Sequence, residues 1–478
     1  MLFNSLNFTL FLPIVFILYW LFFKNNLKHQ NLLLLFSSYF FYAFWDWRFM
    51  FLLIFSTLLD YFTGLKMSES KTIQSKKFWF WLSIIINLGF LAVFKYYNFF
   101  ATSFAEAFLN FGVKIDPWTL KIILPVGISF YTFHGLSYVI DIYNDKIQAE
   151  KNFIDYSLFV SFFPLLVAGP IERATHLLPQ IQKKRVFNYS TAVDGLRQIL
   201  WGLFKKIVIA DQCAKYVNLV FDNQNDYSSG ALISGAVLFA IQIYCDFSGY
   251  SDIALGTARL FGIELLRNFA YPYFSRDIAE FWRRWHISLS SWFKDYLYIP
   301  LGGSKGGNNA RIRNTFIIFL VSGFWHGANW TFIVWGLLHA LFIMPSIIFK
   351  TNRKNIEIIA KDKIFPSLRE FISILITFSL STFAWIFFRA QSLSHATSYI
   401  HKVFTNPLHN EELKVRGDLI ILTLILFLIE WIGRQEQHAL VKFSLNWQPV
   451  YRYAFYITLI ITLFWFGSNE QQFIYFNF

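Results

Sequence analysis

Long apolar runs, separated by short polar and often basic segments, make up most of the chain. They lie near residues 7–23, 31–46, 48–64, 78–103, 121–140, 153–169, 229–247, 314–326, 328–349, 371–389, 418–433 and 453–468. A helix of about 20 apolar residues is needed to cross the hydrocarbon core of a bilayer. The pattern therefore predicts an all-α polytopic membrane protein with about ten to twelve transmembrane helices. Several runs are short or interrupted by Gly and Pro, which is typical of interfacial or re-entrant helices that line a cavity.

The positive charges between the first runs predict the orientation of the chain. Lys24 and Lys28 follow the first run, and residues 66–77 form a lysine-rich loop. Short loops with an excess of Lys and Arg stay in the cytoplasm, so the N-terminus is expected outside. The first run lacks a preceding basic region and a small-residue cleavage site, and we expect it to be retained as a span.

Composition supports one integral membrane unit. Of the 478 residues, 56% are hydrophobic and 15% are charged, whereas a soluble domain carries about 25% charge. No long polar segment interrupts the chain, so residues 1–478 are expected to form a single membrane domain. The net charge of +13 sits in short loops, which indicates anionic lipid as a partner and excludes nucleic acid. Cys213 and Cys245 form no CxxC pattern and imply no disulfide.

The stretch from Arg267 to Asn314 carries eight Lys or Arg and only three acidic residues. Within it, apolar residues recur at three- and four-residue steps: Ile278, Phe281, Trp282, Trp285, Leu289, Trp292, Phe293 and Tyr296. This spacing predicts an amphipathic helix at the membrane face with its basic side outward. His286 lies four residues after Trp282 and therefore belongs to the buried face. On spacing alone, His286 is either a buried structural histidine or a functional group.

A second histidine lies inside an apolar run. His326 follows Arg313 by thirteen residues, which is about 20 Å along a helix. An ionisable side chain at that depth is costly unless it lines a wet cavity or has a partner. Two interpretations fit: His326 is a functional residue, or it is a neutral histidine hydrogen-bonded to a neighbouring helix.

Several long motifs around these histidines resemble one protein family. They are FWRRWHISLSSWFKDYLYIPLGG at 281–303, FWHG at 324–327, PVGISFYTF at 125–133, AGPIER at 168–173 and QIYCDFSGYSDIA at 242–254. In this order they resemble the membrane-bound O-acyltransferase (MBOAT) family, in the bacterial branch typified by the membrane subunit of alginate O-acetylation. The D-alanyl transfer protein of teichoic acids is a more distant relative. The motifs cover residues 120–345, and the layout of apolar runs matches over the whole length.

The resemblance implies a ring of tilted helices around a central tunnel through the membrane. It also implies that His326 is the essential catalytic residue and that His286 is its companion. Acyl transfer to a hydroxyl needs a base near pH 7, and neutral imidazole suits that task. His326 is the candidate base, and His286 would orient it, stabilise developing charge or protonate the leaving group.

The resemblance further implies an acyltransferase of the bacterial inner membrane that modifies a polysaccharide outside the cytoplasm. The acyl group is expected to be acetyl, and the donor a cytoplasmic thioester, either acetyl-coenzyme A or an acyl carrier protein. The acceptor would be alginate or another cell-envelope glycan, reached directly or through a periplasmic acetyltransferase partner. Peptidoglycan acylation and D-alanyl transfer by the same mechanism are alternatives. No bound metal or cofactor is expected.

The remaining candidates are assigned from their position in the motifs. The candidate substrate-binding residues are Trp325, Asn329, Asp246 and Asp252. Asp246 and Asp252 lie in a segment interrupted by Ser and Gly, where they could line the cavity or brace a broken helix. Asn329 shares a face with His326 if that segment is helical, and it could bind substrate or only a backbone carbonyl. His339 and Cys245 are expected to be structural. The turn at residues 302–307 lacks the P-loop pattern, and the nearby basic residues could attract an anionic donor or anionic lipid.

Two other classes of function also fit a buried histidine pair. A transporter or exporter of lipid or glycan would use the histidines as a proton relay. A non-catalytic scaffold for an envelope complex would tolerate loss of His326. The long motifs favour the enzyme over both.

Overall fold

The computed structural model describes residues 1–478 except 122, 362, 408–410, 468–472 and 475–478. Regular structure in the described residues is helical, and β pairing there is limited to an isolated bridge between Tyr227 and Glu411. Six helical segments of this part are long and apolar enough to cross a membrane: Trp47–Glu69, Ile73–Asn110, Ser229–Leu260, Trp330–Ile348, Leu368–Arg389 and Pro449–Phe466. The predicted all-α polytopic class is confirmed. The count of ten to twelve spans and the central tunnel stay predictions.

The chain divides into two compact units, and each is described by itself. The first comprises residues 1–2, 6–188 and 261–265, and the second comprises residues 3–5, 189–260 and 266–478. The prediction that residues 1–478 form one membrane domain is not tested by this division.

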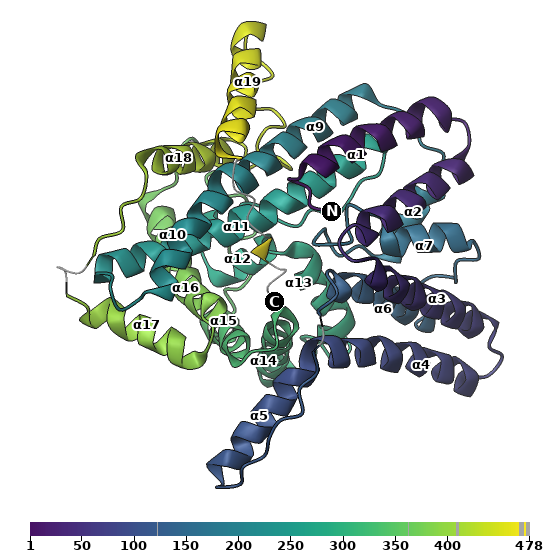
Figure 1. Cartoon of the computed structure of the whole chain (residues 1–478), viewed down its shortest axis with the longest axis horizontal. Coiled ribbons are helices and arrows are strands. Elements are labelled where there is room, and N and C mark those ends of the chain that lie inside the picture. The colour runs from purple at the N-terminus through teal and green to yellow at the C-terminus, as the bar shows by residue number, and fades with distance from the viewer. Residues whose placement is uncertain (122, 362, 408–410, 468–472, 475–478) are drawn as a thin grey trace. The chain divides into compact units, whose positions relative to one another are not determined.

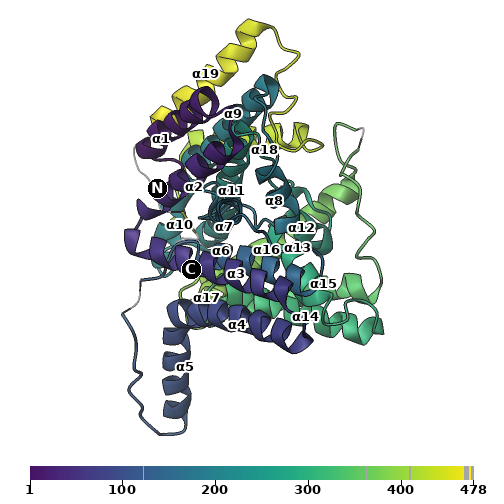
Figure 2. The same cartoon turned by 90° about the vertical axis from the view of Figure 1, so that its right-hand side faces the viewer.

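The first unit contains eight α-helices among its described residues. They are α1 (Leu6–Ile17), α2 (Leu27–Ala43), α3 (Trp47–Glu69), α4 (Ile73–Leu91), α5 (Tyr97–Asn110), α6 (Ile128–Tyr143), α7 (Phe153–Ser161) and α8 (Ala174–Ile181). Helices α3 and α4 pack side by side, and α6 packs on both (Figures 1 and 2).

A buried carboxylate holds these three helices together. Asp60 on α3 accepts hydrogen bonds from Ser83 at 2.6 Å and from Asn87 at 2.7 Å, both on α4. On α6, Gly135 leaves the space for it, because a Cβ there would lie 2.0 Å from Asp60 Oδ2. Polar groups inside an apolar helix bundle must find protein partners, and here they find one another.

The second unit carries both motif histidines. Its α-helices are α9 (Tyr189–Leu203), α10 (Asp211–Asp222), α11 (Ser229–Leu260), α12 (Ile278–Arg284), α13 (Ile287–Phe293), α14 (Gly307–His326), α15 (Trp330–Ile348), α16 (Leu368–Arg389), α17 (Leu393–Thr405), α18 (Gly417–Ile432) and α19 (Pro449–Phe466). A wider helical turn at Phe204–Ala210 joins α9 to α10, so that residues 189–222 form one helical stretch.

Helix α9 runs along the long helix α11 (Figure 1), and glycines set how closely they approach. A Cβ at Gly202 would lie 2.5 Å from the carbonyl oxygen of Gly249, and one at Gly249 would lie 2.7 Å from that of Gly202. Small residues let two helix backbones touch, which is a common way to pack helices in membranes. The backbones of α9 and α11 are therefore in direct contact at these glycines.

The single amphipathic helix expected over the 281–296 motif is wrong. The structure has two short helices, α12 and α13, and the chain turns between them at Trp285 and His286. The basic face is also more buried than expected, since Arg284 is only 9% exposed. The break between the helices arises because His286 adopts a left-handed backbone conformation, with φ of 43° and ψ of 54°, which a continuous α-helix does not contain. Arg284 is buried together with its ion-pair partner Glu280.

Candidate active site

His326 is the last residue of α14, at the turn of a tight helical hairpin. Gly327 follows in extended conformation, and α15 begins three residues later. Close contact of the two helices requires glycine, because a Cβ at Gly323 would lie 2.3 Å from the carbonyl oxygen of Phe332. Across the same interface, a Cβ at Gly336 would lie 2.2 Å from the carbonyl oxygen of Phe319. The hairpin thus fixes where the imidazole of His326 lies.

His286 is held at the start of α13 in a strained conformation. A non-glycine residue in the left-handed region costs free energy, and such residues cluster at functional sites. Its side chain is fully buried. The Nδ1 atom of its ring lies 3.0 Å from Oδ1 of Asn268, while Nε2 is buried without a hydrogen-bond partner among the described residues.

The structure brings the two motif histidines together. Their ring centroids lie 6.4 Å apart with an angle of 57° between the planes. Trp325 contacts both, with its ring centroid 4.9 Å from that of His326 and 6.1 Å from that of His286. His326 is 3% exposed, so the pair is enclosed by protein.

The walls around the pair are aromatic. Trp335 and Phe388 make T-shaped contacts with the His326 ring, with centroids 5.0 and 5.4 Å away. Phe247 lies perpendicular to the His286 ring at 4.7 Å, and Phe269 lies nearly parallel to it at 6.4 Å. Such walls exclude water and strengthen electrostatic interactions inside the site.

Burial sets the protonation state of His286. It lowers the pKa of His286 to about 3, so the ring is neutral at physiological pH. An amide oxygen can only accept, so Asn268 Oδ1 assigns the single ring proton to Nδ1. The Nε2 atom is then an unprotonated acceptor inside the site, which can take a hydrogen bond or a proton.

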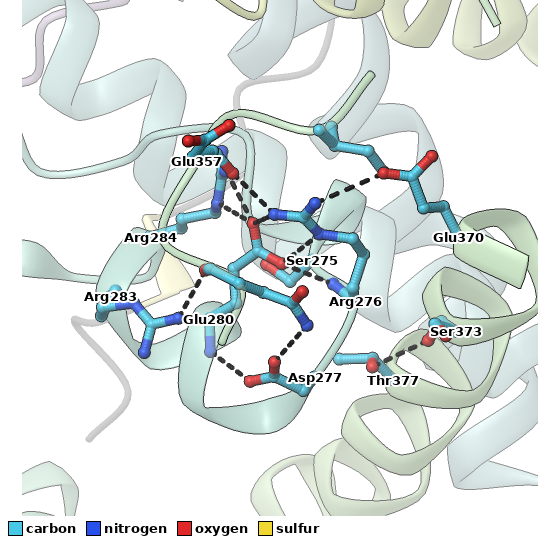
Figure 3. Close-up of polar contacts among 12 residues, drawn as sticks. Ser275, Arg276, Asp277, Glu280, Arg283, Arg284, Glu357, Glu370, Ser373 and Thr377 are labelled. Carbon is cyan, nitrogen blue, oxygen red and sulfur yellow. Dashed lines mark hydrogen bonds and ion pairs between the residues drawn. The ribbon is translucent and has the colours of Figure 1, made fainter. Parts of the chain in front are cut away.

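Behind the site, α12 is fixed by a buried ion cluster (Figure 3). Glu280 is 1% exposed and binds Arg276 at 3.0 Å and Arg284 at 2.8 Å. Arg276 also reaches Glu370 on α16 at 3.3 Å. Arg283 donates to the backbone carbonyls of Asn352 and Asn355, each at 2.8 Å. Arg283 and Arg284, two of the basic residues that could attract an anionic donor, therefore bind protein groups in the structure.

Comparison with known proteins identifies the chain. Residues 144–388 match the membrane-bound O-acyltransferase family. The chain is 38% identical to a probable alginate O-acetylase AlgI of Pseudomonas aeruginosa, over 83% of this chain and 73% of that protein. It is 33% identical to a peptidoglycan O-acetyltransferase of Helicobacter pylori, over 98% of this chain and 95% of that protein. The chain belongs to the MBOAT family.

The predicted family, the enzyme class and the multi-pass membrane nature are therefore confirmed. A more distant similarity, 28% identity over 56% of this chain and 70% of the other, links it to a teichoic acid D-alanyltransferase of Bacillus subtilis. The MBOAT match spans both His286 and His326. The roles of individual residues stay predictions.

Of the predicted substrate-binding residues, Trp325 lies at the histidine pair and Asn329 lies at the start of α15. Asn329 Oδ1 accepts from the backbone N–H of Thr331 at 3.0 Å, and its Nδ2 donates to the carbonyl of Gln391 at 2.9 Å. Helix α14 ends before Asn329, so the condition for a shared helix face with His326 is not met. The side chain of Asn329 caps α15 in this MBOAT protein.

The two predicted aspartates of α11 bind lysines that follow α9. Asp252 lies 2.5 Å from Lys205, and Asp246 lies 2.8 Å from Lys206. Asp246 Oδ2 also accepts from the backbone N–H of Ile474. Both lysines were missed from the sequence, although two adjacent lysines amid apolar residues are a readable signal for buried ion pairs.

His339 and Cys245 are both fully buried. His339 Nδ1 accepts from the indole N–H of Trp282 at 3.2 Å, and Cys245 is a free, buried thiol. Asn268 was also missed, because eighteen residues separate it from His286, and the helix α12 lies between them. Among the described residues, no group of three or more His, Cys, Asp or Glu is placed to hold a metal ion.

Proposed function

We propose that this MBOAT protein transfers an acetyl group from a cytoplasmic thioester donor, acetyl-coenzyme A or an acyl carrier protein, for O-acetylation of a cell-envelope glycan. It would act in the bacterial inner membrane, through a tunnel, with a periplasmic acetyltransferase as its partner. The observation that carries the proposal is the buried His286–His326 pair within the family-matched region. The relatives named for alginate and peptidoglycan O-acetylation support a glycan as the acceptor.

The chemistry balances without an external proton. His326 removes the proton of the attacking hydroxyl as its oxygen bonds to the thioester carbonyl carbon. The C–S bond then breaks, and the imidazolium of His326 returns the proton to the thiolate. The O–H and C–S bonds are exchanged for O–C and S–H bonds.

His286 acts on His326 in this scheme. Its unprotonated Nε2 is an acceptor beside the imidazolium that forms on His326, and accepting a hydrogen bond from it, directly or through water, stabilises the charge. Burying a carboxylate between these apolar walls would cost free energy in the resting state, whereas a neutral imidazole acceptor carries no charge there.

The test compares O-acetyl content of cell-envelope glycan in cells that carry the wild type, His326→Ala or His286→Ala at matched membrane levels. His401→Ala is the control, since His401 lies exposed on α17. We expect both site variants to lose acetylation and the His401→Ala control to keep the wild-type level. Undiminished acetylation in His326→Ala at normal protein level would overturn the proposal and favour the scaffold or transporter.

D-alanyl transfer is the second candidate, favoured by the similarity to the teichoic acid D-alanyltransferase. The two activities are distinguished by which radiolabel, acetyl or D-alanyl, is incorporated into the cell envelope. Cells fed radiolabelled acetate and, in parallel, radiolabelled D-alanine should transfer only the acetyl label in a His326-dependent way. The reverse result would assign D-alanyl transfer.

A further inference from the structure

The side-chain amide of Asn268 contacts the imidazole ring of His286. Asn268 is 1% exposed, and its Oδ1 accepts from His286 Nδ1 at 3.0 Å and from the hydroxyl of Ser288 at 2.9 Å. Its Nδ2 donates to the hydroxyl of Ser251 on α11 at 3.2 Å. Every polar atom of this amide is thus directed at a neighbour in the second unit, so its orientation is fixed.

The same residue also holds the strained backbone of His286. The backbone N–H of Ile287 donates to the Asn268 carbonyl at 2.9 Å, and that of Ala270 donates to the Arg284 carbonyl at 2.9 Å. These two bonds bracket His286 and tie its left-handed turn to residues 268–270. A conformation that costs free energy persists only where the surroundings impose it, and Asn268 is the residue that touches both the turn and the ring.

The amide oxygen decides which ring nitrogen of His286 is available. Because Oδ1 can only accept, the proton must sit on Nδ1, and Nε2 is left as the acceptor. A ring free to take the other tautomer would present a donor instead, and a wrong tautomer removes the acceptor that His326 needs as it becomes charged.

We propose that Asn268 is a positioning residue that fixes the tautomer and orientation of His286 for acyl transfer. This rests on the proposed function, in which His286 Nε2 serves as an acceptor. Asn268 acts through His286 and makes no contact of its own with the reacting groups in this scheme.

The surroundings of Asn268 make Asn268→Asp an informative test of the proposal. Asn268 borders a cavity of about 10 Å³ whose lining does not include His286, and which has room for one water. The charged and titratable groups that border this cavity, tyrosines aside, are Lys205, Asp252, Arg267, Glu430 and His438. The ring of His326 lies 6.4 Å from that of His286, between centroids. A carboxylate at position 268 would keep the acceptor for Nδ1 and border a cavity that holds two cations, Lys205 and Arg267, and two carboxylates, Asp252 and Glu430.

The experiment measures transfer of label from radiolabelled acetyl-coenzyme A to envelope glycan in membrane vesicles between pH 5.5 and about 9, a range chosen around the ordinary histidine pKa. Wild type, Asn268→Ala, Asn268→Asp and His401→Ala are compared at matched amounts of folded protein. His401→Ala is the control, since His401 lies exposed on α17.

Asn268→Ala should lower the rate about 10- to 100-fold at every pH, as expected for loss of one buried hydrogen bond to an acting group. Asn268→Asp should stay within about threefold of wild type above pH 8. Its activity should fall at lower pH, because a carboxylate beside His286 stabilises the imidazolium and removes the Nε2 acceptor. His401→Ala should match the wild type.

Equal losses in Asn268→Ala and Asn268→Asp with the pH profile of the wild type would overturn the proposal, since that is what a purely structural role produces. If Asn268→Ala does not fold, the pH shift of Asn268→Asp decides alone. A second readout needs no activity: nitrogen NMR of histidine-labelled protein in lipid, with the His286 signals assigned from His286→Gln. It should show the Nδ1–H tautomer in wild type and its loss in Asn268→Ala. Inactive wild-type vesicles with this tautomer present would count against the proposed function and not against the role of Asn268.

Discussion

The imidazole rings of His286 and His326 lie 6.4 Å apart inside one aromatic enclosure, although forty residues separate them in sequence. Two separate features bring them together: a glycine-packed hairpin places His326, and a left-handed turn places His286. Neither ring is exposed, and the His286 ring is neutral. Under the proposed function, the two rings act together, with His286 as the acceptor beside the imidazolium that forms on His326.

The first prediction tests this coupling. His326→Ala should lower the rate of acyl transfer about 10²- to 10⁴-fold, which is the usual contribution of a general base. His286→Ala alone should cost about 10- to 100-fold, because a stabilising acceptor is lost. The double variant should be about as slow as His326→Ala, since residues that act as a unit are not additive. Initial rates in membrane vesicles measure all three, and losses that multiply would show that the histidines act independently.

The second prediction concerns acid stability. Burial lowers the pKa of His286 to about 3, whereas the unfolded chain has a histidine pKa near 6.5. Between these values the unfolded state binds a proton that the folded state does not. The stabilising contribution of neutral His286 is therefore present above pH 6.5 and is lost as the pH falls toward 3, by up to about 1.4 kcal/mol per pH unit.

His286→Gln should flatten the acid side of the stability curve, because glutamine does not titrate. Thermal unfolding of the detergent-solubilised protein at a series of pH values measures the slope. His401→Gln should leave the slope unchanged, since that exposed side chain is solvated in both states. An identical acid slope in wild type and His286→Gln would contradict a buried neutral ring.

Helix class and the two motif histidines were readable from the sequence, because apolar run length and residue spacing are local properties. The left-handed backbone conformation of His286 could not be predicted from the sequence. The three- to four-residue spacing from Phe281 to Tyr296 fits one amphipathic helix, yet the chain turns at His286. The bonds that impose the turn come from Asn268 and Ala270, which are distant in sequence and invisible to a periodicity argument.

Buried charge was the other limit of sequence reasoning. Arg276 and Arg284 were interpreted as part of an outward-facing basic surface, because arginine is seldom buried without a partner. Their partner is Glu280 on α12, which was counted only as one of three acids. Spacing of four residues made the pairs geometrically available, but the burial of the cluster depends on packing against α16 and the segment at residues 352–357, as Figure 3 shows.

The third prediction concerns the hairpin that carries His326. Gly336→Ala places a Cβ 2.2 Å from the Phe319 carbonyl oxygen, so the two helices must separate. Overpacking of this kind costs about 1–3 kcal/mol, and it should lower the unfolding temperature and displace His326. Gly89→Ala is the matched control, because a Cβ on that helical glycine meets nothing within 4 Å.

Gly89→Ala should leave the unfolding temperature unchanged or raise it, since alanine favours helix by up to about 1 kcal/mol. Thermal unfolding in detergent and the rate of acyl transfer are read on the same samples. If Gly336→Ala behaves like Gly89→Ala in both, the close packing of α14 on α15 is not needed to hold His326.

The fourth prediction concerns the ion cluster of Figure 3. Glu280→Gln removes the charge that two guanidinium groups share, and both are largely buried, with side-chain exposures of 12% for Arg276 and 11% for Arg284. Removing one partner of a buried ion pair costs about 3–5 kcal/mol, because the remaining charges stay desolvated and repel each other. The expected result is a marked fall in unfolding temperature and in the amount of folded protein.

The exposed pair of Lys66 and Glu69 provides the comparison for that cluster. Its atoms lie 2.8 Å apart, but the side chains are 41% and 64% exposed, and such pairs contribute about 0–1 kcal/mol. Glu69→Gln should therefore leave the unfolding temperature nearly unchanged. Because Glu280 lies on α12 behind His286, Glu280→Gln should also lower acyl transfer per folded molecule, while Glu69→Gln should not. Equal stability and equal specific activity of the two variants would show that the buried cluster does not hold α12 in place.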